Sequence, residues 1–244
     1  MKVLVFDIWG DYGHFRKFYT TTSPLTFSFP PPPTIAGILG AIYGTDKNTN
    51  EYLEIFGTNK CMIALRILNP VKKVRMGLNL LETSGKNFYR PMSDKNHAPL
   101  IRTQIRTEFL KDPRFRIYVS HKDDKVFDRL SEIIELHQPY YTVSLGLSEL
   151  LADFKYVGVY QAEIITSSEA AELSTTVLVD NLIKDGLEIE TGKKYFKEKI
   201  PMVMNKDRIV GKYDYVVFEP DGKKIKARVK TYYRIENDEN IAFF

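Results

Sequence analysis

Cysteine and long apolar runs are almost absent from this chain of 244 residues. Cys61 is the only cysteine, which excludes an internal disulfide and a cysteine-based zinc site. Because it lies inside the apolar run Cys61–Leu65, the sequence predicts a buried, inert thiol. No run is long enough to span a bilayer, and Asp7 interrupts the first apolar segment too early for a signal peptide. We therefore expect a cytoplasmic protein.

The signature motifs of several enzyme classes are also missing. Gly37, Gly40 and Gly44 are not followed by Gly-Lys-Ser or Gly-Lys-Thr, so the sequence has no phosphate-binding P-loop. It contains no Gly-x-Ser-x-Gly nucleophile elbow and no His, Asp and Glu cluster at metal-ligand spacing. These absences predict a protein that uses neither a cofactor nor a metal ion.

Positive charge in one segment and many aromatic rings are what the chain does have. It contains 15 Tyr and 15 Phe beside one Trp, and its formal net charge is +4. Between Val71 and Arg116, eleven Lys and Arg accompany four Asp and Glu, so this segment carries +7 and the rest of the chain −3. Such a concentration is the electrostatic footprint of a phosphate-binding surface.

Hydrophobic periodicity predicts a chain of mixed helices and strands. Apolar residues recur at helical spacing from Thr34 to Tyr43 and from Asp124 to His137, and a short helical turn is expected at 51–56. The long polar stretch around residues 82–113 indicates a projecting β-hairpin arm. Strands are predicted at residues 2–8, 60–68, 74–81, 114–119 and 156–165.

The order of these elements defines the expected fold class. Strand, helix, strand, arm, strand, helix, strand fits an α+β fold of the ferredoxin-like type, β-α-β-β-α-β, as in RNA-recognition motifs. We predict this palm at residues 1–165, with a β-hairpin thumb at about 71–120. Residues 166–244 are predicted to form a small C-terminal all-β subdomain, in which Glu219–Gly222 makes a hairpin turn.

The loop after the first strand combines rings and cations. It carries Tyr12, Phe15 and Tyr19 next to Arg16 and Lys17, and four prolines follow at residues 30–33. In RNA-binding surfaces, rings stack on bases while Arg and Lys neutralise phosphates. The alternative is a surface loop whose rings anchor it to the core.

Four segments, in their order and spacing, carry a family resemblance: Phe6–Thr20, Ser23–Pro31, Thr34–Gly44 and Tyr140–Ala152. They resemble the Cas-five family of CRISPR-associated proteins, RAMP-superfamily subunits of type I Cascade complexes, and look most like the type I-B branch. The resemblance implies a ferredoxin-like palm with a thumb that caps the complex and grips the 5′ handle of the CRISPR RNA (crRNA) in antiviral defence. The implied partners are the crRNA, the Cascade backbone subunit and the large subunit, with target DNA met only indirectly.

A subunit that binds this handle needs donors for phosphates and flat faces for bases. In the palm, we expect Arg16 and Lys17 to contact phosphates and Tyr12 and Tyr19 to stack on bases. Gly146 matches a glycine-containing turn that lies near the guide in the family.

After that turn, a helix beginning near Ser148 would offer backbone amides to a phosphate. On the thumb, the expected RNA contacts are Arg75, Lys86, Arg90, Arg102 and Arg106. The alternatives are an ordinary turn and a solvated basic arm.

One branch of the family cuts precursor RNA, which raises the possibility of catalysis. Metal-free RNA cleavage requires a base for the 2′-hydroxyl and an acid or cation for the leaving oxygen. His97 beside Lys95 is the only suitable histidine, with Tyr43 or Tyr89 as helpers. Because no complete set of tyrosine, lysine and histidine maps onto the chain, we predict a noncatalytic RNA-binding subunit. The alternatives are a metal-independent endoribonuclease that processes precursor crRNA and a stand-alone RNA-binding domain.

Overall fold

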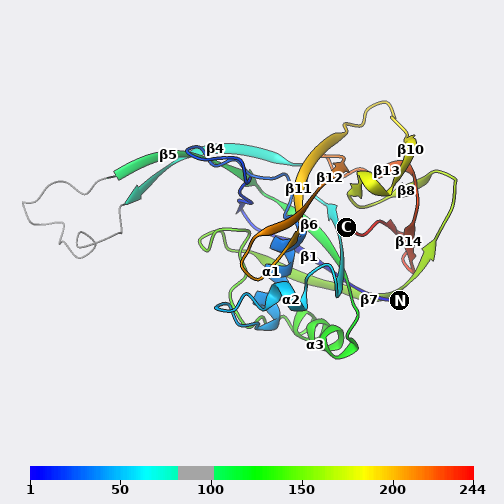
Figure 1. The fold of residues 1–244 in the computed structure, drawn as a ribbon, viewed down its shortest axis with the longest axis horizontal. Helices are drawn as coiled ribbons and strands as arrows, with labels where there is room; N and C mark the ends of the chain where they lie inside the picture. The colour runs from blue at the N-terminus through cyan, green and yellow to red at the C-terminus, as the bar shows by residue number, and fades with distance from the viewer. Residues whose placement is uncertain (82–101) are drawn as a thin grey trace, which may run out of the picture.

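The computed structural model describes residues 1–81 and 102–244. The described chain is mostly β, and its largest sheet has six strands in the order β15-β14-β7-β1-β6-β3 (Figure 1). Neighbouring strands in this sheet are antiparallel. The six strands are β1 (Lys2–Trp9), β3 (Cys61–Ile67), β6 (Arg114–His121), β7 (Asp153–Ile165), β14 (Tyr232–Ile235) and β15 (Asn240–Ile241).

Both faces of this sheet are buried, which explains the nearly continuous apolar run of β1. Alternate residues such as Phe6 and Ile8 enter the main core, between the sheet and the helices. Val3 and Val5 enter a second core on the opposite face. The helices are α1 (Pro32–Tyr43), α2 (Tyr52–Ile55) and α3 (Asp124–Glu135).

The helix boundaries follow from the local sequence, and the two predicted long helices are confirmed. Pro32 and Pro33 occupy the first two positions of α1, where no amide hydrogen bond is needed, and Gly44 ends the helix in a left-handed conformation. The Asp123 carboxylate caps α3 by accepting a 2.9 Å hydrogen bond from the Lys125 amide. None of the helices in residues 1–81 and 102–244 is long and apolar enough to cross a membrane.

The arm projects from the body of the molecule (Figure 1). It consists of β4 (Lys72–Leu81) and β5 (Arg102–Lys111), which pair in an antiparallel register along their whole lengths. At its base, β2 (Tyr12–Gly13) pairs with the other edge of β5. The loop after β1 is therefore attached to the arm.

The arm is shorter than the predicted segment 71–120. Strand β6 lies in the middle of the six-stranded sheet, between β1 and β3. Its alternate residues Phe115, Ile117 and Val119 are buried in the main core. In a projecting hairpin, the strand face that carries these three side chains would be exposed to water. The hydrophobic pattern therefore favours a central position in the sheet.

Residues 166–244, predicted as a β subdomain, pack partly on the main sheet and core and partly in a hydrophobic cluster of their own around Leu173 and Ala227. Strand β14 pairs with β7, and β11 (Phe196–Met204) and β12 (Val210–Phe218) form a hairpin that buries Ile200 and Val216 in the main core. The other elements of this region are β8 (Ala171–Leu173), β9 (Val177–Leu178), the 3-10 helix η2 (Val179–Asn181), β10 (Leu182–Leu187) and β13 (Ile225–Val229).

The turn Glu219–Gly222 does not close the predicted hairpin. The strands that it connects, β12 and β13, belong to different three-stranded sheets. The Glu219 carboxylate accepts hydrogen bonds from the amides of Asp221 and Lys223 at 2.8 and 2.9 Å. Gly222, with a φ of 80°, lies against the carbonyl oxygen of Ile67 in β3. The turn thus carries the chain past the edge of the main sheet into another sheet.

Candidate nucleic-acid interface

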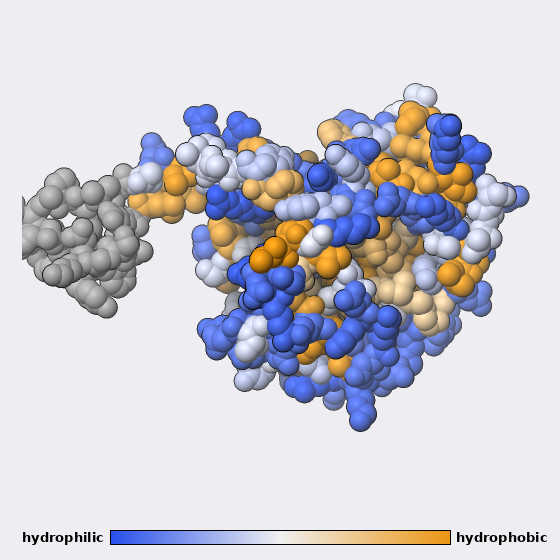
Figure 2. Space-filling view, in the orientation of Figure 1, coloured by the Kyte–Doolittle hydropathy of each residue, from blue (hydrophilic) through white to orange (hydrophobic). Residues whose placement is uncertain are grey.

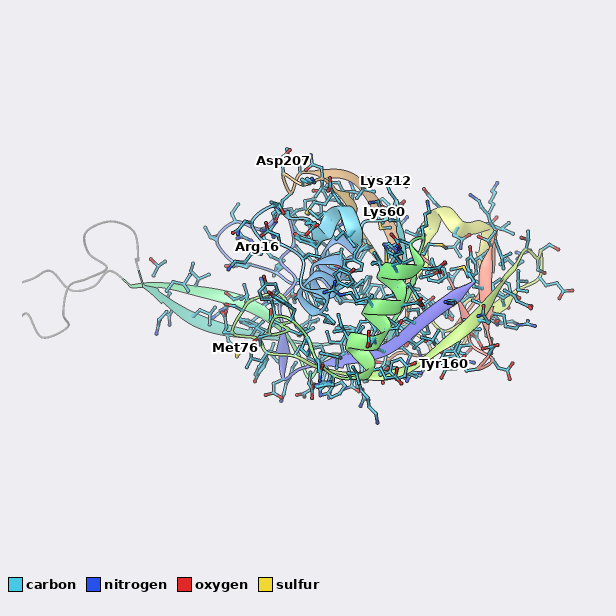
Figure 3. The ribbon with its side chains drawn as sticks, turned by 90° about the horizontal axis from the view of Figure 1, so that it is seen from below. Arg16, Lys60, Met76, Tyr160, Asp207 and Lys212 are labelled. Carbon is cyan, nitrogen blue, oxygen red and sulfur yellow. The ribbon has the colours of Figure 1, made fainter. Side chains whose placement is uncertain are left out.

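An open groove of about 690 Å³ lies where the arm meets α1 and the loop after β1. Figure 3 shows Arg16, Met76 of the arm and Asp207 of the β11–β12 turn on the side of the body from which the arm projects, away from Tyr160. The turn after α3 completes the groove. Its lining residues include His14, Arg16, Leu78, Ile105, Thr107, Gly146, Glu149 and Arg208.

Arg16, which the sequence analysis predicts to contact phosphate, lines the groove. Its guanidinium donates hydrogen bonds to the carbonyl oxygens of Thr20 and Thr21 at 3.0 and 3.4 Å, which curls the loop around it. The residue is exposed, and no carboxylate of the described residues lies within ion-pair distance. Its charge is therefore available to an anionic ligand.

Arg208 is a second groove cation, which sequence reasoning missed. It lies in the β11–β12 turn with a φ of 61°, and its amide donates to the Asn205 carbonyl oxygen at 2.9 Å. Nothing in the local sequence distinguishes it from other surface arginines. Only the packing of the β11–β12 hairpin against α1 brings it to the groove that Arg16 lines.

Lys17 is engaged inside the protein. Its ammonium forms an ion pair with Glu198 of β11 and lies 5.6 Å from the centre of the Phe27 ring. Burial alone would lower the pKa of Lys17, but the hydrogen bond and charge of Glu198 outweigh it and raise the pKa. This residue therefore ties the loop to β11, and a phosphate would have to compete with Glu198 for it.

The three rings of the loop have different environments. Phe15 is buried in the main core, and Tyr12 is half-buried with its ring edge-on to Phe109 at 6.3 Å. Tyr19 is 59% exposed and lies edge-on to Phe18 at 5.1 Å. The alternative of a core anchor thus holds for Phe15, while Tyr19 has an accessible ring.

Gly146 occupies a tight turn at the groove wall. Its φ is 104°, a conformation that favours glycine, and the Leu145 carbonyl oxygen accepts a 2.9 Å hydrogen bond from the His14 amide. The expected helix at Ser148 is absent. Instead, the chain closes into a short loop in which Ser144 and Leu151 form a β-bridge.

The arm presents two chemically different faces. Because β4 and β5 are antiparallel, cross-strand partners share a face. The pairs Leu78–Ile105 and Met76–Thr107 place an apolar and hydroxyl-bearing face toward the groove. Arg75, whose partner Glu108 lies 3.6 Å away, and Arg106, opposite Gly77, occupy the other face.

The predicted thumb cations are therefore only partly described. Arg75 and Arg106 lie on the face of the arm that alternates with the groove-lining face. The backbone of Arg102 belongs to β5, but its side chain lies outside the described part of the structure. Lys86 and Arg90 also lie outside the described residues.

Residues 3–215 match the family described as CRISPR-associated protein (Cas_Cas5). This chain belongs to the Cas5 family. The match confirms the Cas-five resemblance, whereas the type I-B branch stays a prediction. No curated protein sequence matches this Cas5-family chain.

Two solved structures have a similar fold. A chain of a structure titled "CRISPR RNA-guided surveillance complex" is 12% identical, with a TM-score of 0.52 over 92% of this chain and 91% of that chain. A CRISPR protein from Archaeoglobus fulgidus is 15% identical, with a TM-score of 0.54 over 99% and 98% of the two chains. At these identities the likeness concerns the fold of this Cas5-family protein.

The histidines that the structure describes all have polar partners. His14 Nδ1 donates to the Glu108 carbonyl oxygen at 2.7 Å, and burial lowers the pKa of His14 so that the ring is neutral at pH 7. His121 is buried with both ring nitrogens hydrogen-bonded to backbone groups. His137 contacts the Asp153 carboxylate at 3.2 Å.

The proposed catalytic alternative rests on residues that the structure largely does not describe. His97, Lys95 and Tyr89 lie outside the described residues. Tyr43 packs edge-on against Phe56 at 5.5 Å. In the described part of this Cas5-family protein, no three His, Cys, Asp or Glu are grouped to hold a metal ion.

Proposed function

We propose that this protein is a noncatalytic subunit of a type I CRISPR RNA-guided complex and that its groove holds the 5′ handle of the crRNA. The observation that carries the proposal is the convergence of Arg16, Arg208 and the Gly146 turn in one open groove. Guanidinium groups pair well with phosphate oxygens, and the apolar arm face offers contacts for bases. The fold likeness to a chain of an RNA-guided surveillance complex supports a place in such an assembly.

We further propose that the central strands form the ferredoxin-like palm. The partial order β7-β1-β6-β3, with α1 between β1 and β3 and α3 between β6 and β7, supports this assignment. The cations on the arm face that does not line the groove, Arg75 and Arg106, then belong to a second contact. Its partner is the guide beyond the handle or the neighbouring backbone subunit.

The test is binding and cleavage of labelled CRISPR repeat RNA in EDTA, read in the same reactions. The test variant is Arg16→Ala/Arg208→Ala. The control is Arg228→Ala/Arg234→Ala, which removes two exposed arginines from β13 and β14 and changes the net charge equally. We expect the RNA to remain uncut in all reactions. The test variant should bind it at least tenfold more weakly than the original protein, and the control variant should not.

Salt dependence provides an independent readout. Single-strand contacts contribute about 0.7 per phosphate to the slope of log affinity against log salt, so the test variant should lose about 1.4. Equal weakening of both variants would contradict the groove as the RNA site. A single cut at the base of the repeat hairpin would favour the endoribonuclease, and His97→Ala would then be the first replacement.

A further inference from the structure

A second set of rings and cations lies on the outer face of the β11–β12 hairpin. The inner face is fixed by Ile200 and Val216, which are fully buried in the main core. Strand alternation therefore turns the neighbouring lysines and tyrosines outward. We name this set the aromatic–lysine surface, and it consists of Phe18, Tyr19, Lys197, Lys199, Tyr213 and Tyr215.

Phe18 contacts the rings of Tyr19 and Tyr213, and lysine ammonium groups lie over the rings of Tyr213 and Tyr215. The Phe18 ring lies 4.6 Å from the Tyr213 ring. Lys197 Nζ lies 4.4 Å from the centre of the Tyr215 ring, and Lys199 Nζ lies 5.4 Å from that of Tyr213. Phe18 is 51% exposed and Tyr215 is 44% exposed, so much of this ring area faces solvent.

The charge of this surface is uncompensated. No carboxylate in residues 1–81 or 102–244 lies within ion-pair distance of Lys197 or Lys199. Glu198 lies between them in sequence, but it points to the inner face, where it pairs with Lys17. In the view of Figure 2, the most hydrophobic area lies instead over β10 and β13. The aromatic–lysine surface is thus positive and amphipathic rather than simply apolar.

We propose that the aromatic–lysine surface binds a stretch of single-stranded nucleic acid outside the groove. Rings beside lysines on an exposed sheet are the composition of single-strand binding platforms, since every base has a flat face to stack and a phosphate to neutralise. Protein–protein interfaces are also rich in aromatic residues, but they are depleted in lysine. An exposed ammonium–ring contact is weaker than a base–ring stack, so a base displaces the ammonium, which then meets the phosphate.

The surface is connected to the groove along the chain. Arg16 lines the groove and Phe18 follows it by two residues, while Met204 and Arg208 of the same β11–β12 hairpin also line the groove. A nucleic-acid strand that leaves the groove on this side meets Phe18 and then Tyr213 and Tyr215. The surface needs no contact in the groove, so its binding can be tested separately.

The test measures binding of fluorescein-labelled uridine and thymidine 20-mers by anisotropy over a range of salt concentrations. The first variant is Lys197→Ala/Lys199→Ala. Its control, Lys194→Ala/Lys226→Ala, removes two lysines that are already paired with Asp221 and Glu188 and changes the net charge equally. The second variant is Tyr215→Leu, with Tyr140→Leu as a control at a ring that is 68% exposed.

We expect the double lysine variant to bind at least fivefold more weakly and its salt slope to fall by about 1.4, from about 0.7 per contact. Tyr215→Leu should bind at least threefold more weakly with an unchanged slope, because it removes stacking and no charge. Both controls should stay within twofold of the original protein. Binding of both 20-mers, or of the RNA or the DNA alone, supports the proposal and shows which kind of nucleic acid the surface accepts.

The proposal is overturned if neither 20-mer binds or if the two test variants behave like their controls. The groove variant Arg16→Ala/Arg208→Ala separates this result from the proposed function. If that variant binds repeat RNA normally while the double lysine variant loses 20-mer binding, the handle proposal fails and this inference stands. The reverse pattern leaves the groove as the RNA site and rejects the aromatic–lysine surface.

Discussion

Gly146 lies directly against the backbone of His14. A Cβ atom at position 146 would be 1.8 Å from the His14 carbonyl oxygen, far inside van der Waals contact. The hydrogen bond from the His14 amide to the Leu145 carbonyl oxygen joins the same two segments of the chain. The turn after α3 and the loop after β1 can therefore approach this closely at the groove wall only because residue 146 has no side chain.

Replacing Gly146 with alanine should force these two backbones apart. We expect Gly146→Ala to lower the free energy of unfolding by about 3 kcal/mol, the upper end of the cost of a strained backbone, because a clash is added to the positive φ. Gly192→Ala is the matched control, since its φ is 82° but nothing lies within 4 Å of the added atom. Urea unfolding measures both, and equal losses would refute the proposed close approach.

The ion pair of Lys17 and Glu198 should stabilise the attachment of the loop to β11. Lys17→Met leaves the carboxylate, 12% exposed in its side chain, without its cation, so we expect the free energy of unfolding to fall by about 2 kcal/mol. In contrast, Lys2→Met removes an exposed pair with Asp128 and should have little effect.

The ion pair of Lys17 and Glu198 should also make the free energy of unfolding depend on pH. The folded-state pKa of Lys17 is raised above its ordinary 10.5, so the folded protein holds this proton more tightly than the unfolded chain. The stabilisation is complete below pH 10.5 and is lost as the pH rises through the higher folded-state value. The stability difference between Lys17→Met and the original protein should therefore be constant at neutral pH and shrink in strong alkali. A constant difference throughout would argue against the ion pair.

The Cys61 thiol should be inert in the folded protein. Burial in β3 raises the pKa of Cys61 to about 12, so the thiolate is scarce at pH 8. We expect iodoacetamide to leave the native protein unmodified and to alkylate it once in urea, as measured by the intact mass. Rapid alkylation without denaturant would show that β3 opens readily.

Asp7 should be one of the more costly polar residues to remove. It is 4% exposed, and its carboxylate accepts hydrogen bonds from Arg116 Nε at 2.7 Å and from Arg114 at 3.2 Å. Asp7→Ala removes this carboxylate from both partly buried guanidinium groups and leaves Arg116 only its longer 3.8 Å contact with Glu239, at an expected cost of about 3 kcal/mol in the free energy of unfolding. Thermal or urea unfolding beside Asp128→Ala, at an exposed position, provides the comparison. A similar loss in both would exclude a special role for the buried pair.

The elements that could be predicted from the sequence are those whose pattern is local. The heptad-like spacing of α3 and the apolar run of β1 identify these elements without reference to the rest of the chain. The boundary of the arm could not be predicted in this way, because Arg114–His121 is a strand in either arrangement. Its pairing with β1 and β3, far away in the sequence, decides which one forms.

The candidate site shows the same limit. Arg16 and Gly146 could be identified because each belongs to a recognisable segment. The pairing of Lys17 with Glu198 and the arrival of Arg208 at the groove depend on a hairpin about 180 residues later in the chain. Ring burial is equally non-local, since Phe15 and Tyr19 are alike in sequence context and opposite in exposure.

The alternation of side chains along β4 and β5 has a consequence for how partners can be arranged around the arm. A molecule in the groove meets leucine, isoleucine and threonine, whereas a molecule on the other side meets Arg75 and Arg106. Two binding partners can therefore occupy the same pair of strands without competing for a single side chain. The arm can therefore lie between two neighbouring molecules, one of which contacts its apolar face and the other its basic face.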